Sequence, residues 1–192
     1  MHRLIAIIFA IIIAMGLMNA QSEWKLDKAH SSITFSVRHM VISEVTGNFK
    51  EYSIKVNSAR DDFSDATVES TIKVASINTD NTMRDDHLKS DDFFNAEKYP
   101  NITLKNAVFE KVSDNKYKIT GDLTIRDVTK KITFDATLNG QIKTPTGLLS
   151  AWKATTIINR FDFNLKWSKT LETGGLMVGQ DVTITMNLEL NK

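Results

Sequence analysis

The chain has 192 residues, no cysteine, and 24 basic against 23 acidic residues whose signs are interspersed. Without cysteine it cannot be a disulfide scaffold, and without a basic face it lacks the usual feature of a nucleic-acid-binding protein. Two prolines and eight glycines exclude a low-complexity disordered chain. No internal repeat or linker is visible, so one folded domain is expected.

Residues 1–20 have the pattern of a secretory signal peptide. A positive charge at Arg3 precedes an uncharged apolar run that ends at Met18, and this run is shorter than the about 20 residues of a membrane-spanning helix. We place cleavage after Ala20 rather than after Gly16, with an uncleaved anchor as the alternative. The mature domain is then residues 21–192, with 23 basic and 23 acidic residues.

The mature chain alternates apolar and polar residues with period two, which is typical of half-buried strands. Asp114-Asn115 and Arg126-Asp127 form tight turns between neighbouring strands, and such short links join antiparallel strands only. Eight strands are predicted, over 32–39, 47–57 with a bulge, 67–75, 102–109, 116–125, 128–142, 148–158 and 182–190.

Eight antiparallel strands with one apolar face each must close into a barrel or stack as a sandwich. Strands of ten to fifteen residues reach about 33 to 50 Å at roughly 3.3 Å per residue, which favours a tall closed barrel. An eight-stranded barrel is either filled by its own side chains or holds one small ligand. The predicted inner faces mix small and aliphatic residues, so we expect an all-β single barrel with room for a ligand.

The alternation stops in one central segment, where charges cluster around two adjacent phenylalanines, Phe93 and Phe94. A short helical insert around residues 81–95, capped by Asp80 or Asn81, is expected there. An insert of this kind in a barrel indicates a lid or a mouth, and therefore ligand binding more than catalysis.

Short motifs in a specific order run through nearly the whole mature chain, from Trp24 to about Leu190. They are Trp24-Lys25-Leu26-Asp27, Phe35-Ser36-Val37-Arg38-His39, Gly47-Asn48-Phe49, Arg84-Asp85-Asp86-His87-Leu88, Asp92-Phe93-Phe94-Asn95, Gly121-Asp122-Leu123-Thr124-Ile125 and Asn159-Arg160-Phe161-Asp162-Phe163. Together they resemble the bacterial YceI-like family of lipocalin-like, polyisoprenoid-binding proteins. One departure is Asn164, at a position where the family often has glycine.

The resemblance implies a lipocalin-like barrel whose apolar tunnel takes up a long isoprenoid or similar lipid tail. It also implies export to the periplasm, no catalysis, and pairing as a homodimer; no cofactor and no nucleic-acid partner are expected. Because burying each CH2 is worth about 0.8 kcal/mol, a dry tunnel binds a polyprenyl chain without polar contacts. We therefore predict a periplasmic carrier for a polyisoprenoid, an isoprenoid quinone, a polyprenyl phosphate or another long-chain lipid.

Two groups of residues form the predicted site. We expect apolar residues of the inner faces to line the tunnel: Phe35, Val37, Ile72, Val74, Leu104, Ile119, Leu123, Ile132, Phe134 and Ile184. We expect cationic and aromatic residues on and near the insert to form the tunnel mouth: Arg38, His39, Arg84, His87, Phe93 and Phe94. Which end of the barrel is the mouth does not follow from the sequence.

Several side chains have two interpretations. Phe93 and Phe94 either plug the barrel end or line its entrance. Lys130 and Lys153 lie in phase with apolar neighbours, so each either points into the barrel or reaches solvent at the rim. The aromatic residues of the last third of the chain form either a gate or a separate small core: Trp152, Phe161, Phe163 and Trp167.

Other functions are alternatives to a carrier. His30, His39 and His87 with nearby acids would make a metal site, but no pair has a zinc-binding spacing and we predict none. No Gly-x-Ser-x-Gly elbow or cysteine nucleophile is present, and we predict no catalytic residue. One alternative is an envelope stress-response interaction protein with an incidental cavity. The other is a small-molecule enzyme that uses the same cavity, with His39, His87 and nearby acids as its reactive groups.

Overall fold

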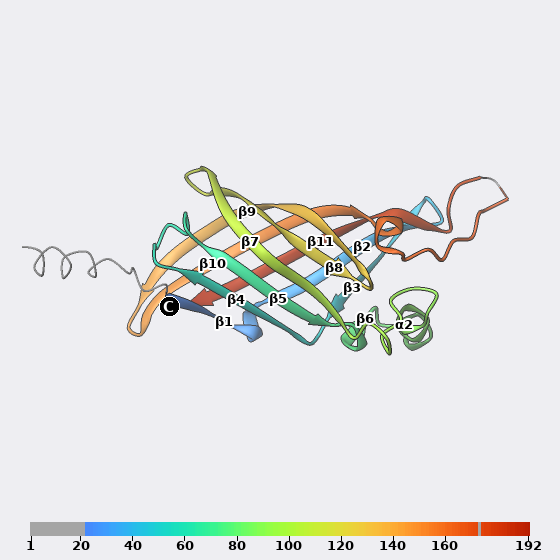
Figure 1. Ribbon diagram of the computed structural model, residues 1–192, viewed down its shortest axis with the longest axis horizontal. Coiled ribbons are helices and arrows are strands. Elements are labelled where there is room, and N and C mark those ends of the chain that lie inside the picture. Colours follow the sequence, from blue (N-terminus) through green and yellow to red (C-terminus); the bar gives the residue numbers. More distant parts are fainter. Residues whose placement is uncertain (1–21, 173) are drawn as a thin grey trace, which may run out of the picture.

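The computed structural model describes residues 22–172 and 174–192, and these form a closed eight-stranded antiparallel β-barrel, as predicted. The barrel is elongated along the horizontal axis of Figure 1, and the C-terminus lies at one end. The predicted signal peptide, residues 1–20, lies outside the described residues. Within the described part of the chain, no helix combines the length and apolarity needed to cross a membrane.

Eleven strand segments make the barrel because some of its strands are interrupted. The segments are β1 (Ser22–Leu26), β2 (Ser32–His39), β3 (Ser43–Phe49), β4 (Tyr52–Ser58), β5 (Thr67–Lys73), β6 (Ile77–Asn78), β7 (Asn101–Ser113), β8 (Lys116–Ile125), β9 (Val128–Thr144), β10 (Gly147–Asn159) and β11 (Val178–Asn191). The long strand β11 pairs with β1 near its end and with β2 along the rest of its length. From β1 the pairing continues to β4 and then to β5, and from β2 it continues to β3 and then to β6.

The predicted strand 47–57 is divided in the structure. It begins earlier, at Ser43, and its first part ends at Phe49. The Lys50 amide then leaves the ladder and donates to the Ser76 carbonyl (3.1 Å). The irregularity that the sequence indicated as a bulge is therefore a bend between β3 and β4.

Two further boundaries differ from the predictions. The predicted strand 67–75 ends at Lys73, because a 3-10 turn, η2 (Val74–Ser76), follows it. The strand β1 was not predicted, since Trp24 is its single buried side chain and five residues give no clear alternation. β7, β9 and β11 also run past their predicted bounds, whereas β2 and β8 have the predicted ones.

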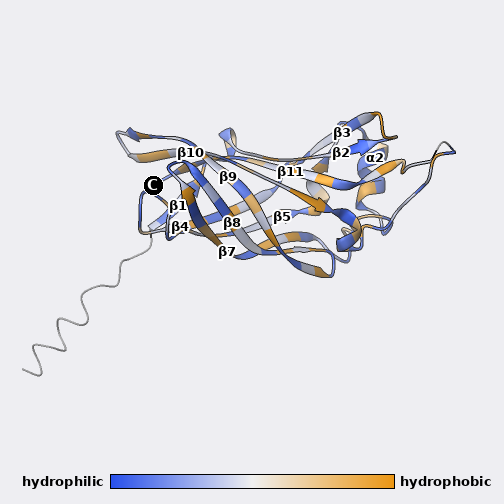
Figure 2. Ribbon diagram, turned by 90° about the horizontal axis from the view of Figure 1, so that it is seen from above, coloured by the Kyte–Doolittle hydropathy of each residue, from blue (hydrophilic) through white to orange (hydrophobic). Residues whose placement is uncertain are grey.

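The alternation predicted from the sequence places apolar side chains inside the barrel. Along β8, Tyr117, Ile119, Leu123 and Ile125 are buried, whereas Lys116 and Lys118 on the other face are exposed. Figure 2 shows the same alternation of hydrophilic and hydrophobic residues along several strands. The core therefore fills the inside of the barrel rather than a face between two layers.

An aromatic cluster closes one end of the barrel. The ring centroids of Trp24 and Phe63 are 4.5 Å apart, those of Phe63 and Trp152 4.8 Å, and those of Trp152 and Tyr117 5.0 Å. The Tyr117 hydroxyl donates to the Asp62 carbonyl (2.7 Å), which holds the β4–β5 loop over this end. Burial raises the pKa of Tyr117 above its usual range. We call this the closed end.

The other end is covered by the β2–β3 turn, by the segment between β6 and β7, and by residues 160–172 and 174–177 (Figure 1). The helix α2 (Thr82–Lys89) begins after Asn81, whose side chain accepts a hydrogen bond from the Arg84 amide (3.0 Å). Of the two predicted caps, Asn81 is therefore the cap. The helix is shorter than the predicted insert 81–95, because turns follow it.

The segment 160–177 begins with a 3-10 turn, η3 (Arg160–Phe163). Asn164 ends this turn in the left-handed region (φ 60°, ψ 21°). Asparagine is one of the few residues besides glycine that adopt this conformation readily. This explains how the chain keeps the turn where a glycine is often expected.

Candidate functional site

The barrel contains an apolar cavity of about 110 Å³, which we call the inner cavity. Side chains from β2, β3, β5, β7, β8, β9, β10, β11 and η3 line it, together with α2 and the residues after it. Seven of the ten predicted tunnel residues are among them: Phe35, Val37, Ile72, Leu104, Leu123, Phe134 and Ile184.

The other three predicted tunnel residues lie elsewhere. Ile119 lines a second cavity of about 30 Å³, nearer the closed end, which we call the lower cavity. Val74 is buried but belongs to η2, where the strand alternation no longer sets its direction. Ile132 is half-buried and packs against the core without lining either cavity.

A larger chamber of about 550 Å³ opens at the end covered by α2, and we call it the mouth chamber. Five of the six predicted mouth residues line it: Arg38, His39, Arg84, His87 and Phe93. The sixth, Phe94, lines the inner cavity instead and packs edge-on against Phe49, with the ring centroids 6.2 Å apart. The structure thus places the mouth at the end opposite the aromatic cluster.

The mouth chamber and the inner cavity lie next to each other, and the side chains between them, which we call the neck, line both spaces. They are Phe35, Val37, Leu88, Phe93 and Val178. All five are apolar, so a chain that passes from the chamber into the barrel meets only apolar side chains at this point. Phe93 therefore plugs the barrel and lines its entrance at the same time.

The aromatic side of the mouth chamber is built around Phe93. Its ring centroid lies 5.5 Å from that of Trp167 and 5.0 Å from that of His87. His87 Nε2 lies 2.8 Å from a carboxylate oxygen of Asp92, and this contact connects α2 with the turn that follows it. Trp167 belongs to this gate-like group, whereas Trp152 lies in the cluster of the closed end.

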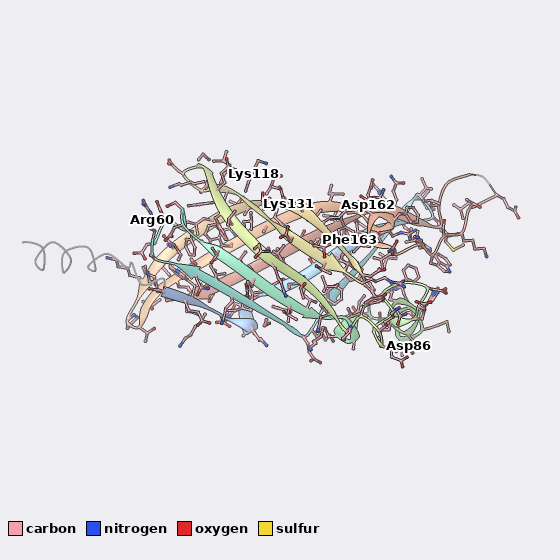
Figure 3. The ribbon with its side chains drawn as sticks, in the orientation of Figure 1. Arg60, Asp86, Lys118, Lys131, Asp162 and Phe163 are labelled. Carbon is pink, nitrogen blue, oxygen red and sulfur yellow. The ribbon has the colours of Figure 1, made fainter. Side chains whose placement is uncertain are left out.

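The polar side chains of the mouth chamber are cationic or neutral: Arg38, His39, Asn81, Arg84 and His87. Among the described residues that line it, none carries a carboxylate. The nearby acids are turned to other partners: Asp85 accepts hydrogen bonds from the Thr79 amide and hydroxyl, and Asp86 pairs with Lys89 (3.1 Å). Figure 3 labels Asp86, which belongs to α2. The chamber therefore presents donors and positive charge beside an apolar wall.

Arg160 is a site residue that the sequence interpretation did not single out. The residue is 3 % exposed, and its guanidinium donates to the carbonyl groups of Gly179 (2.8 Å), Leu165 (2.6 Å), Trp167 (2.8 Å) and Val178 (3.0 Å). Burial lowers the pKa of this guanidinium from its usual value. Arg160 lines the inner cavity and holds the segment that forms one wall of the mouth. Every residue has a backbone carbonyl, so the sequence contains no pattern that indicates these hydrogen bonds.

The two lysines that lay in phase with apolar neighbours do not enter the barrel. Lys130 pairs with Asp162 (3.0 Å), which Figure 3 shows beside Phe163, and Lys153 is exposed. Of the aromatic residues whose role was open, Phe163 is buried in the core.

The three histidines do not converge. His39 and His87 line the mouth chamber, whereas His30 lies with Asp27 and Glu189 in a group whose ligand-type atoms are within 4.8 Å of one another. The Asp27 carboxylate there caps η1 (Lys28–His30) and lies 3.0 Å from His30 Nδ1. These two bonds account for the group as part of the fold.

Comparison with known proteins agrees with this geometry. Residues 24–190 match the model of the YceI-like domain. The chain belongs to the YceI-like family. The UPF0312 protein SA2479 of Staphylococcus aureus (strain N315) is 38% identical over 176 residues, which cover 88% of this chain and 98% of that protein.

Several solved structures share the fold of this chain. The YCEI protein of Campylobacter jejuni is 37% identical, with a TM-score of 0.70 over 89% of this chain and 98% of that one. BcnA of Burkholderia cenocepacia is 25% identical, with a TM-score of 0.73 over 86% and 99%. A polyisoprenoid binding domain from Saccharophagus degradans, 13% identical with a TM-score of 0.59 over 89% and 98%, shares the fold.

Proposed function

We propose that this YceI-like protein is a periplasmic carrier that holds the tail of a long-chain lipid in its barrel. The observation that carries the proposal is the change of lining along one path. The mouth chamber has cationic and amide side chains beside apolar ones, the neck is apolar, and the inner cavity is almost wholly apolar. An amphiphile with a polar head and a long apolar tail matches this order. The name of the S. degradans domain, which shares the fold, is consistent with a polyisoprenoid tail.

The lining of the mouth chamber favours an anionic head group. Arg38 and Arg84 both line the chamber, and phosphate is the group that guanidinium binds in two-pronged geometry. Arg84 donates to Thr79 from Nε (2.7 Å) and Nη2 (2.6 Å), which fixes its guanidinium beside the chamber and leaves Nη1 for a head group. A polyprenyl phosphate therefore fits the chamber better than a neutral isoprenoid quinone. A carboxylate lipid would use the same side chains.

The tail needs more space than the two cavities inside the barrel provide. The inner and lower cavities are about 110 and 30 Å³, whereas sites for drug-sized ligands measure about 300–1,000 Å³. Ser70, Leu104 and Met186 line both cavities, so small side-chain movements there would join them. Binding of a long tail thus requires the interior to widen.

The first test is organic extraction of the purified mature protein, followed by mass spectrometry of the extract. A stoichiometric long-chain isoprenoid or other lipid, chemically unaltered, is the expected result. A lipid recovered as a reaction product would favour an enzyme. An empty protein that also takes up no added polyprenol would favour an interaction protein with an incidental cavity.

A pair of variants locates the ligand. Val182 lines the inner cavity, so Val182→Trp fills it and should abolish lipid uptake. Ile157 lies on the outer face of β10 and is 66% exposed, so Ile157→Trp adds a similar bulk outside the barrel. Uptake should persist in the second variant. Equal uptake by both variants would contradict binding inside the barrel.

A further inference from the structure

The mouth end carries exposed apolar side chains outside the chamber itself. The β2–β3 turn consists of Met40, Val41 and Ile42, which are 40%, 59% and 87% exposed. Met83, at the start of α2, is 84% exposed. Figure 2 shows hydrophobic colour on this turn, at the same end of the molecule as α2. We call these four residues the apolar tip.

The backbone of the turn is unfavourable for the residues that it holds. Met40 has φ 50° and Val41 has φ 69°, a region that is uncommon for non-glycine residues and rare for β-branched ones. Turns of this kind usually contain asparagine or glycine. Local strain with exposed apolar side chains indicates that these side chains serve a purpose other than stability.

The apolar tip is continuous with the opening of the barrel. Met83 lines the mouth chamber, and the turn follows directly after Arg38 and His39, which also line it. The Met40 amide donates to the carbonyl of Met177 (2.8 Å), another residue of the chamber wall. A surface that covers the tip would therefore face the entrance.

Charge at this end of the barrel is mixed. The Met177 amide donates to the Lys169 carbonyl (2.8 Å), so the segment with Lys166 and Lys169 lies beside the turn. The insert that carries Met83 has exposed acids, among them Asp86 and Asp92. The tip therefore offers a membrane mainly its apolar side chains, which can insert into the headgroup region.

We propose that the apolar tip docks the barrel, mouth first, on the surface of a lipid bilayer, so that a lipid passes directly between the bilayer and the mouth chamber. This inference rests on the proposed carrier function, because a lipid ligand resides in a bilayer. The size of the tip favours a bilayer over a second copy of the chain. A stable protein interface buries about 800 Å² per partner, from about 20–30 residues, whereas the tip has four large apolar side chains.

The test is flotation of the mature protein with vesicles of phosphatidylcholine and phosphatidylglycerol. Ile42→Asp should weaken vesicle binding roughly tenfold or more, because it puts a charge in place of an apolar side chain that docking would bury in the bilayer. The matched control is Ile142→Asp, since Ile142 is 60% exposed near the end of β9, two residues before the β9–β10 turn at the closed end. The control should bind vesicles like the wild-type protein. Equal binding by the two variants would overturn the proposal.

A second variant removes the apolar side chains while relieving the backbone. Met40→Asn with Val41→Gly places residues that tolerate positive φ in the turn. The melting temperature should stay the same or rise, while vesicle binding falls. Unchanged vesicle binding in this variant would also overturn the proposal.

Lipid uptake from detergent micelles separates docking from ligand binding. Ile42→Asp should take up lipid from micelles at the wild-type level but from vesicles more slowly. Loss of uptake from both sources would overturn the docking role, because the turn would then serve the ligand site. A wild-type dimer that Ile42→Asp dissociates would overturn it in favour of a second copy. Failure of the carrier function would appear differently, as no uptake from micelles by the wild-type protein.

Discussion

The Arg126 guanidinium donates a 2.6 Å hydrogen bond from Nη1 to the carbonyl of Phe93, the residue that lines both the neck and the mouth. Arg126 lies in the β8–β9 turn, and the same nitrogen also donates to the Asp91 carbonyl (3.0 Å) and the Asn164 carbonyl (3.3 Å). Its Nη2 pairs with the Asp91 carboxylate (3.0 Å). One side chain thus connects the insert, the barrel rim and the segment after η3.

Arg126→Ala should loosen the insert without altering the barrel. The Arg126 side chain is only 14% exposed, and hydrogen bonds from charged groups contribute about 1.5–3 kcal/mol each in such settings. We expect a loss of about 1–3 kcal/mol in the free energy of unfolding, and faster hydrogen exchange of the amides around Phe93. Lipid release should also become faster, since the neck opens more often.

Arg60→Ala is the matched control for this change. Arg60 pairs with Asp62 (3.1 Å), and its side chain is 63% exposed. Figure 3 labels Arg60 at the closed end of the barrel. Its removal should leave exchange around Phe93 and lipid release unchanged. An effect of equal size from both variants would contradict a specific role of Arg126 in holding the insert.

Gly47→Ala should narrow the neck. A Cβ at Gly47 would overlap the Phe35 ring and come within 2.7 Å of Thr79 Cγ2, so the ring must move. Phe35 lines both the inner cavity and the mouth chamber, and its displacement should slow lipid uptake. Overpacking of this kind typically costs about 1–3 kcal/mol of stability.

Gly140→Ala provides the comparison for the neck variant. A Cβ at Gly140 meets no atom within 4 Å. Stopped-flow uptake of a fluorescent polyprenol should therefore be slower for Gly47→Ala and unchanged for Gly140→Ala. Wild-type uptake rates in both proteins would show that the Phe35 ring does not control entry.

The fold was predictable from the sequence where each strand has one buried face. Period-two alternation predicted the bounds of β2 and β8 and the closure of the barrel, because an exposed apolar face is costly. It failed for β1 and for Val74, where a short segment or a 3-10 turn has no periodic signal. The pattern within a strand also carries no information about which barrel end is open.

The site was predictable in its residue types more than in its contacts. The mouth residues cluster in the insert, so Arg84, His87 and Phe93 were found from local composition. Arg160 and the placement of Trp167 were not, because they depend on hydrogen bonds to carbonyl groups and on the path of residues 164–177. Those features arise only when distant segments meet at the same end of the barrel.

The Asp27–His30 pair should give the protein a defined pH dependence. A hydrogen bond from His30 lowers the pKa of Asp27 below 3.8, and the bond to Asp27 raises the pKa of His30 above 6.5, with a smaller contribution from Glu189. The His30 contribution to stability is complete below pH 6.5 and is lost as the pH rises through its raised pKa. The Asp27 contribution is complete above pH 3.8 and is lost as the pH falls through its lowered pKa.

NMR titration of the His30 ring tests this interpretation. Asp27→Asn should lower the pKa of His30 toward 6.5, because the charged hydrogen-bond partner that raises it is removed. Asp92→Asn, which removes the partner of His87, should leave the His30 titration unchanged. A His30 pKa that does not respond to Asp27→Asn would contradict the pairing.

Ser70 should determine how long a lipid tail the barrel accepts. Its side chain is buried and lines both the inner and the lower cavity, on the path toward the aromatic cluster of the closed end. Ser70→Phe would separate the two cavities, so that a tail could occupy only the inner cavity. Binding of farnesol, a short isoprenoid, should be retained, while binding of a long-chain polyprenol should weaken roughly tenfold or more, since several CH2 groups lose their burial. The control is Thr71→Phe, because Thr71 is the next residue of β5 and points to the opposite face. Equal weakening of the short and the long ligand by Ser70→Phe would show that the lower cavity takes no part in holding the tail.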